Sequence, residues 1–297
     1  MLSFRPVYYA LMPLFVLLAA TFFACIIGYG LILLSDNNLP LVKTISKTTQ
    51  VLLVLSLFPA LNLLGFNRKT LGFTLNRTFF KQLLQGAALG FISLLPVFIA
   101  LYALGVHVID STKSTDLGFV LQKISLALFT AVLIALIEES LFRGVIFLSL
   151  KQKINLRAAL VISSFYYAAL HFLQTKTQLP ANEISLWHSF AVALQAFANL
   201  LNPRILSAFA ALFMVGIFLA LLRERASLAW CIGCHSSWVL QIKLSKEFFN
   251  TDVTAPYRGL VSDYDGVIGN FVTVWLLLLV CIYLTLKSKL ITKVSLY

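Results

Sequence analysis

The sequence predicts an all-α protein, a polytopic bundle of about eight transmembrane helices that forms a single integral membrane domain over residues 1–297. Three observations predict this class: 60% of the 297 residues are apolar, only 11% are charged, and the apolar residues gather in long runs. A helix of about 20 apolar residues crosses the ~30 Å hydrocarbon core of a bilayer. The runs lack the ten-residue alternation of a membrane β-barrel, so helices are expected.

Each apolar run is expected to form one spanning helix. The first run is long and has only Arg5 as a charge ahead of it, so we expect a retained helix rather than a cleaved signal. The polar stretch 175–203 has room for a ninth, shallow or re-entrant segment. In chain order, the expected spans are 8–34, 49–66, 83–104, 124–150, 157–174, 204–222, 227–243 and 268–286.

An even number of spans places both termini on one side of the membrane. Lys and Arg are more frequent on the side that holds the termini, which predicts that both termini are cytoplasmic and favours a bacterial inner membrane. This asymmetry, together with contact between basic residues and anionic lipids, accounts for the net charge of +12. Membrane lipids are therefore expected partners, and a nucleic-acid partner is not expected.

All four cysteines fall within expected spans, where a thiol packs as a small apolar side chain. We therefore expect no disulfide framework. The sequence Cys231-Ile-Gly-Cys234-His235 matches the C-x-x-C-H pattern of covalent haem attachment. It lies in apolar sequence near the expected cytoplasmic face, whereas bacterial c-type haem is attached outside, so this interpretation is not favoured. The cysteines are Cys25, Cys231, Cys234 and Cys281.

The fourth span contains three charged residues, Glu138, Glu139 and Arg143. A charge at the centre of a membrane helix costs at least ~2.5 kcal/mol, so it indicates a function. At α-helical spacing Glu139 and Arg143 share a face and can pair, while Glu138 is turned ~100° away. This predicts that Arg143 neutralises Glu139 and that Glu138 acts on something else. A purely structural salt bridge would leave the second acid unexplained.

Two histidines lie inside later spans, His171 in the fifth and His235 in the seventh. At a rise of 1.5 Å per residue, Glu138 lies about 20 Å, His171 about 21 Å and His235 about 15 Å from the cytoplasmic end of its span. The three side chains can therefore meet at similar depth. The other two histidines, His107 and His188, fall in loop-like sequence, and we expect them to be solvated.

One carboxylate and two imidazoles suit the activation of water. Glu138, His171 and His235 can bind a divalent metal such as zinc and leave a position open for water. Alternatively, Glu138 is itself the general base in a metal-free glutamate mechanism, and the histidines orient water or stabilise the oxyanion. Both routes hydrolyse an amide. The sequence has no P-loop, dinucleotide-binding fingerprint or H-E-x-x-H motif.

Three motifs together resemble the CPBP family of intramembrane glutamic or metalloproteases, which includes CAAX proteases and bacteriocin-processing proteins. They are Glu138-Glu139-x-x-x-Arg143, Tyr167-x-x-x-His171 and the helix around His235. The resemblance covers residues 120–245, a family-like catalytic core. It implies an intramembrane endopeptidase that hydrolyses a peptide bond of a membrane-associated protein or peptide. The catalytic residues that it implies are Glu138, Glu139, Arg143, His171 and His235.

The sequence departs from the family pattern at two positions. Tyr167 replaces the usual Phe and keeps the aromatic ring. Val239 stands where the family has Asn or Asp, and valine can neither bind a metal nor form a hydrogen bond. A non-catalytic relative, acting as an immunity or scaffold protein, is therefore one alternative. A proton-coupled transporter that uses Glu138 as the carrier is another, although no inverted repeat supports it.

Overall fold

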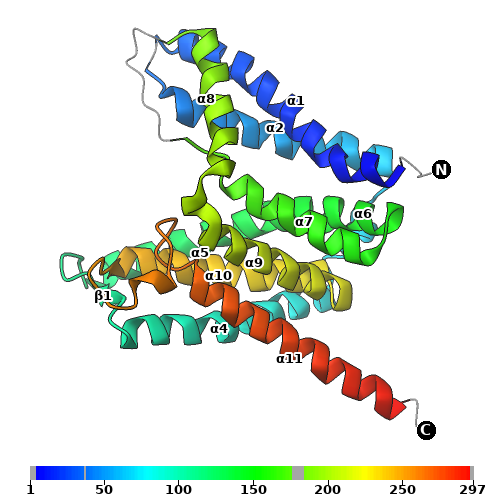
Figure 1. Cartoon of the computed structure of the whole chain (residues 1–297), viewed down its shortest axis with the longest axis vertical. Helices are drawn as coiled ribbons and strands as arrows, with labels where there is room; N and C mark the ends of the chain where they lie inside the picture. Colours follow the sequence, from blue (N-terminus) through cyan, green and yellow to red (C-terminus); the bar gives the residue numbers. More distant parts are fainter. Residues whose placement is uncertain (1–4, 37, 176–183, 295–297) are drawn as a thin grey trace. The chain divides into compact units, whose positions relative to one another are not determined.

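The protein is built almost entirely of helices, in a computed structural model that describes residues 5–36, 38–175 and 184–294 (Figure 1). The predicted all-α class is confirmed. Two strands of three residues, β1 (His107–Ile109) and β2 (Phe249–Thr251), pair antiparallel within the described part of the chain.

The chain folds into two compact units, and each unit is built from two separate segments. Met1–Phe73 and Ser140–Arg204 form the first unit, and Thr74–Glu139 and Ile205–Tyr297 form the second. The family-like core of residues 120–245 therefore contributes to both units. A single integral membrane domain stays a prediction.

The first unit contains two long apolar helices and several shorter ones. Helix α1 packs against α2 and α8, and α6 packs against α7. The side chain of Asn155 caps α7 by accepting a hydrogen bond from the backbone N–H of Ala158 at 2.9 Å. The elements of this unit are α1 (Arg5–Leu34), α2 (Leu41–Leu64), α3 (Arg68–Leu71), the π-helix η1 (Ser140–Ile146), α6 (Phe147–Lys153), α7 (Leu156–His171), α8 (Leu186–Ala198) and the 3-10 turn η3 (Asn199–Leu201). A second 3-10 turn, η4 (Pro203–Ile205), follows.

Helix α10 is the centre of the second unit. It packs against α4, α5 and α9, while α11 packs against α9 and α4 (Figure 1). Most of the side chains from Leu228 to Trp238 are buried, although α10 carries several polar residues. The helical elements of this unit are α4 (Arg77–Ala103), α5 (Leu117–Glu139), α9 (Leu206–Arg225), α10 (Leu228–Phe248), the 3-10 turn η5 (Arg258–Leu260) and α11 (Asn270–Val294).

Each of the eight predicted spans coincides with a helix, but five of the described helical stretches are long and apolar enough to cross a membrane. Helix α7 has only 16 residues, and α10 is interrupted by polar side chains, so the number of spans stays a prediction. The five stretches are Pro6–Leu34, Leu41–Leu64, Arg77–Ala103, Leu117–Lys153 and Pro203–Arg225.

The structure adds to the predicted helices in two places. The second helix begins at Leu41, not at residue 49, because the polar turns that hold Lys43 and Lys47 are helical as well. Helix α8 lies in the stretch 175–203, where an additional segment was expected.

Candidate active site

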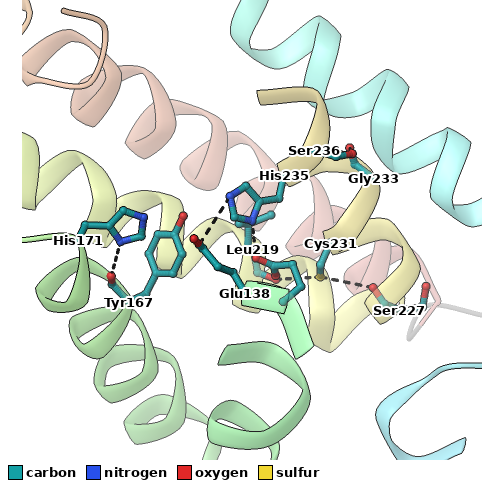
Figure 2. Close-up of polar contacts among 10 residues, drawn as sticks. Glu138, Tyr167, His171, Leu219, Ser227, Cys231, Gly233, His235 and Ser236 are labelled. Atoms are coloured by element: carbon teal, nitrogen blue, oxygen red, sulfur yellow. Dashed lines mark hydrogen bonds and ion pairs between the residues drawn. The ribbon is translucent and has the colours of Figure 1, made fainter. Parts of the chain in front are cut away.

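The imidazole of His235 lies between two carboxylates in the second unit (Figure 2). His235 is on the second turn of α10 and is 4% exposed. Its Nδ1 lies 2.8 Å from Oε1 of Glu139, which is completely buried. Because a carboxylate only accepts hydrogen bonds, Nδ1 carries the hydrogen. Glu139 therefore fixes the orientation of the ring and stabilises a positive charge on it, as buried carboxylates do in other histidine sites.

Glu138 approaches the same ring from the other nitrogen. Its Oε2 lies 3.9 Å from Nε2 of His235, which is too long for a direct hydrogen bond. A single oxygen atom can still lie about 2.8 Å from both groups, so a water fits their geometry. The side chain of Glu138 is 27% exposed, whereas that of Glu139 is 0% exposed. The two neighbouring glutamates thus offer one accessible carboxylate and one buried carboxylate.

Glycines hold the backbone of α10 directly against α4 and so determine where His235 lies. A Cβ atom on Gly90 would come within 2.4 Å of the carbonyl oxygen of Cys234, and one on Gly233 within 2.0 Å of the carbonyl oxygen of Leu83. No side chain fits between the two backbones at these points. Gly233 and Cys234, the two residues before His235, are therefore held by backbone contact with α4.

The loop before α11 brings a further side chain into the field of Glu138. Burial raises the pKa of Tyr264, and the nearby charges of Asp265 and then Glu138 raise it further. Tyr264 is therefore a neutral phenol, a hydrogen-bond donor, near the accessible glutamate. The sequence did not point to it, because a tyrosine in a polar loop carries no signal of its own.

The first unit holds the remaining predicted residues. His171 lies at the end of α7, and its Nδ1–H donates to the backbone oxygen of Tyr167 at 2.7 Å (Figure 2). The Tyr167 ring packs against His171 on one side, with 4.7 Å between centroids, and the guanidinium of Arg143 lies 4.5 Å from its centre. Arg143 is 1% exposed. Arginine over a tyrosine ring is a favourable cation–π arrangement.

The structure therefore groups Glu138, Glu139 and His235 in one unit, and Arg143, Tyr167 and His171 in the other. The hydrogen bond from His235 to Glu139 was not predicted. Arg143 lies in the π-helix η1, whereas Glu139 ends α5, so the α-helical i, i+4 geometry assumed for this pair does not apply. The predicted pairing of Glu139 with Arg143 and the convergence of His171 on Glu138 stay predictions.

A catalytic zinc is usually held by three protein ligands. Within the described residues, no group of three His, Cys, Asp or Glu side chains is arranged to hold a metal ion. Glu138 and His235 together offer two donors. Among the described residues, this donor set does not complete a zinc site.

The other two histidines are buried or partly buried, and the four cysteines are free thiols. His107 was expected to be solvated, and this prediction is wrong: it is 4% exposed in β1, with Nε2 2.8 Å from the carbonyl oxygen of Gly266. His188 is partly buried, and its Nδ1 lies 3.0 Å from Oγ of Ser185 at the start of α8. All four cysteines are free, as the sequence predicted.

Comparison with known proteins identifies a family for the segment that holds these residues. A family model described as type II CAAX prenyl endopeptidase Rce1-like matches residues 120–240. The matched segment, residues 120–240, is similar to the CPBP family. The resemblance seen in the motifs is thereby confirmed over a segment that runs from α5 to α10 and includes every predicted site residue. No curated protein and no solved structure matches the chain. With its long apolar helices, the chain is an integral membrane protein.

Proposed function

We propose that this protein is an intramembrane endopeptidase that hydrolyses a peptide bond of a membrane-associated protein or peptide. The observation that carries the proposal is the arrangement of Glu138, Glu139 and His235 within the segment that matches a prenyl endopeptidase family. A buried carboxylate–imidazole pair beside a second, accessible carboxylate is suited to activating water.

In the proposed reaction, Glu138 is the general base. Its carboxylate takes a proton from a water molecule, and the water oxygen attacks the carbonyl carbon of the scissile peptide bond. His235, protonated and stabilised by Glu139, donates Nε2–H to the oxyanion that forms. Glu138 then returns its proton to the leaving amine as the C–N bond breaks. Water and peptide bond are thus converted into a carboxylic acid and an amine, and the enzyme regains its starting state.

A zinc-dependent route is the alternative that uses the same side chains. It requires His171 as a third ligand beside Glu138 and His235. Inhibition by a chelator and recovery with added zinc would favour this route over the metal-free one.

A non-catalytic scaffold or immunity function is the second candidate, and Val239 favours it. This residue lies one turn after His235 on α10, at the position where the family has Asn or Asp. An apolar side chain there removes one polar group from the site. A scaffold would keep its function without Glu138.

The deciding experiment replaces Glu138 with glutamine, which keeps the size of the side chain and removes the base. Membranes that carry Glu138→Gln are compared with wild type by mass spectrometry of accumulated peptides. General acid–base catalysis contributes about 10²–10⁴-fold, so cleavage should fall at least 100-fold.

Glu247→Gln is a matched control, because the Glu247 side chain is 24% exposed and its carboxylate lies 2.8 Å from the Lys123 ammonium, outside the site. It should cleave at the rate of wild type. Normal cleavage by Glu138→Gln, at normal levels in the membrane, would reject the hydrolase and leave the scaffold.

A further inference from the structure

The first unit contains a cavity of about 830 Å³, and its lining includes none of the glutamates of the proposed protease site. Its walls come from α1, the first half of α2, the end of α7 and α8. Ligand sites in proteins commonly have volumes of about 300–1,000 Å³, so this cavity is large enough for a specific ligand.

One wall of the cavity is polar, and it belongs to the polar first turns of α2, a helix whose second half is mostly apolar. Lys43, Ser46, Thr49 and Gln50 of α2 all line the cavity. Their spacing of three, three and one residues places them on a single face of the helix. Helix α2 has a mean hydropathy of 1.4, the lowest of the five candidate spans. Polar side chains in a membrane helix are costly, and they typically line a cavity or a binding site.

The charge of the residues that line the cavity favours an anionic ligand. Lys43 is the only charged residue among the described residues that line the cavity. The hydroxyl of Thr21 on α1 and the amide of Gln174 after α7 add further polar groups. Lys43 is exposed beside neutral hydrogen-bonding groups, and none of the described lining residues carries a carboxylate, which suits a phosphate or carboxylate ligand.

Most of the other lining residues are apolar, among them Leu17 on α1, Leu53 on α2 and Phe197 on α8. A small soluble anion would leave this surface in contact with water. A molecule with an anionic head and a hydrocarbon chain would cover both parts of the wall. Lys43 is the third residue of its candidate span, which corresponds to the head-group level of a bilayer.

We propose that this cavity binds an anionic phospholipid, with the phosphate at Lys43 and the start of an acyl chain along Leu17, Leu53 and Phe197. Basic pockets between membrane helices bind acidic head groups by the same chemistry. The site would tie a bilayer lipid to the unit that also carries His171. This proposal does not depend on the proposed protease activity.

Native mass spectrometry of the purified full chain tests the proposal directly. The protein is exposed to equal amounts of phosphatidylglycerol and phosphatidylcholine, and the lipid retained on the intact protein is measured. Phosphatidylglycerol should be retained preferentially, because its head group has no cation to compete with Lys43. Lys43→Gln should lower this retention about fivefold, the effect of one basic residue near an anionic lipid.

Lys69→Gln is the matched control, since Lys69 lies on α3 of the same unit, is exposed, and does not line the cavity. It removes the same charge and should leave retention unchanged. Ala196→Phe, which adds a ring to the cavity wall, should lower retention while Lys43 is intact. The melting temperature of each variant without lipid establishes that it is folded.

Three results would overturn the proposal. Equal loss in Lys43→Gln and Lys69→Gln would indicate general attraction to a charged surface. Equal retention of the two lipids would show that the head-group charge is not recognised. Protection against heat by inorganic phosphate alone, dependent on Lys43 and as large as that by phosphatidylglycerol, would assign the site to a free anion.

Discussion

Replacing Gly90 with alanine should displace the proposed catalytic histidine without touching it. The added Cβ would lie 2.4 Å from the carbonyl oxygen of Cys234, the residue before His235. Ordinary van der Waals contact begins near 3.4 Å, so α4 and α10 must separate by about 1 Å. A shift of that size is enough to break the 2.8 Å contact of His235 with Glu139. Overpacking of this kind costs about 1–3 kcal/mol.

The expected result is a lower melting temperature in detergent and, if the protease proposal holds, cleavage reduced about 100-fold. Gly30→Ala in α1 is the control, because a Cβ there meets no atom within 4 Å. Alanine should leave that helix equally stable or stabilise it by about 0.5–1 kcal/mol. If Gly90→Ala melts at the same temperature as Gly30→Ala and cleaves normally, the backbone contact does not position His235.

Two further predictions concern buried charges. Arg143→Ala should destabilise the protein by about 3–5 kcal/mol, because it removes a guanidinium that is 1% exposed, and the double variant Glu139→Gln with Arg143→Gln should be milder. A double-mutant cycle measures the coupling, and a value near zero would reject the predicted pairing of these two residues. The second prediction concerns Asp265, where burial raises the pKa above its ordinary value of 3.8, against hydrogen bonds from the backbone and the charges of Lys246 and His107. The folded protein then favours the protonated carboxyl, so this contribution to stability is full below pH 3.8 and is lost as the pH rises through the raised pKa. Asp265→Asn should therefore be more stable than wild type at neutral pH, with the difference disappearing in acid; a difference that grows on acidification in thermal denaturation would contradict the assigned direction.

The sequence was sufficient to predict the helices and to single out the charged and histidine residues within them. Runs of apolar residues form helices because lipid leaves the backbone no other partner, and each run is helical, although the run 124–150 changes helix type at Ser140. The start of α2 at Leu41 was missed, because the polar residues near Lys43 lower the hydropathy of that turn. Tyr264 was missed because its proximity to Glu138 arises from the fold and from no pattern in the sequence.

The partners of the two glutamates could not be predicted from helical periodicity. Counting 1.5 Å per residue placed Glu138 and His235 at depths about 5 Å apart, yet His235 Nε2 lies 3.9 Å from Glu138 Oε2. The offset between two helices is set by their packing, here that of α5 against α10, and not by distance from the ends of the helices.

The same limit applies to Glu139 and Arg143, because an i, i+4 pair was inferred for an α-helix that in fact continues as a π-helix at Ser140. A π-helical turn holds more residues than an α-helical turn and rotates every later side chain, and such turns are frequent at functional sites. The change from α5 to η1 falls directly after the two glutamates. Arg143 packs on the Tyr167 ring, and Glu139 accepts a hydrogen bond from His235. The motif Glu-Glu-x-x-x-Arg thus marks a change of helix type, and its spacing identifies the residues of the site without giving their partners.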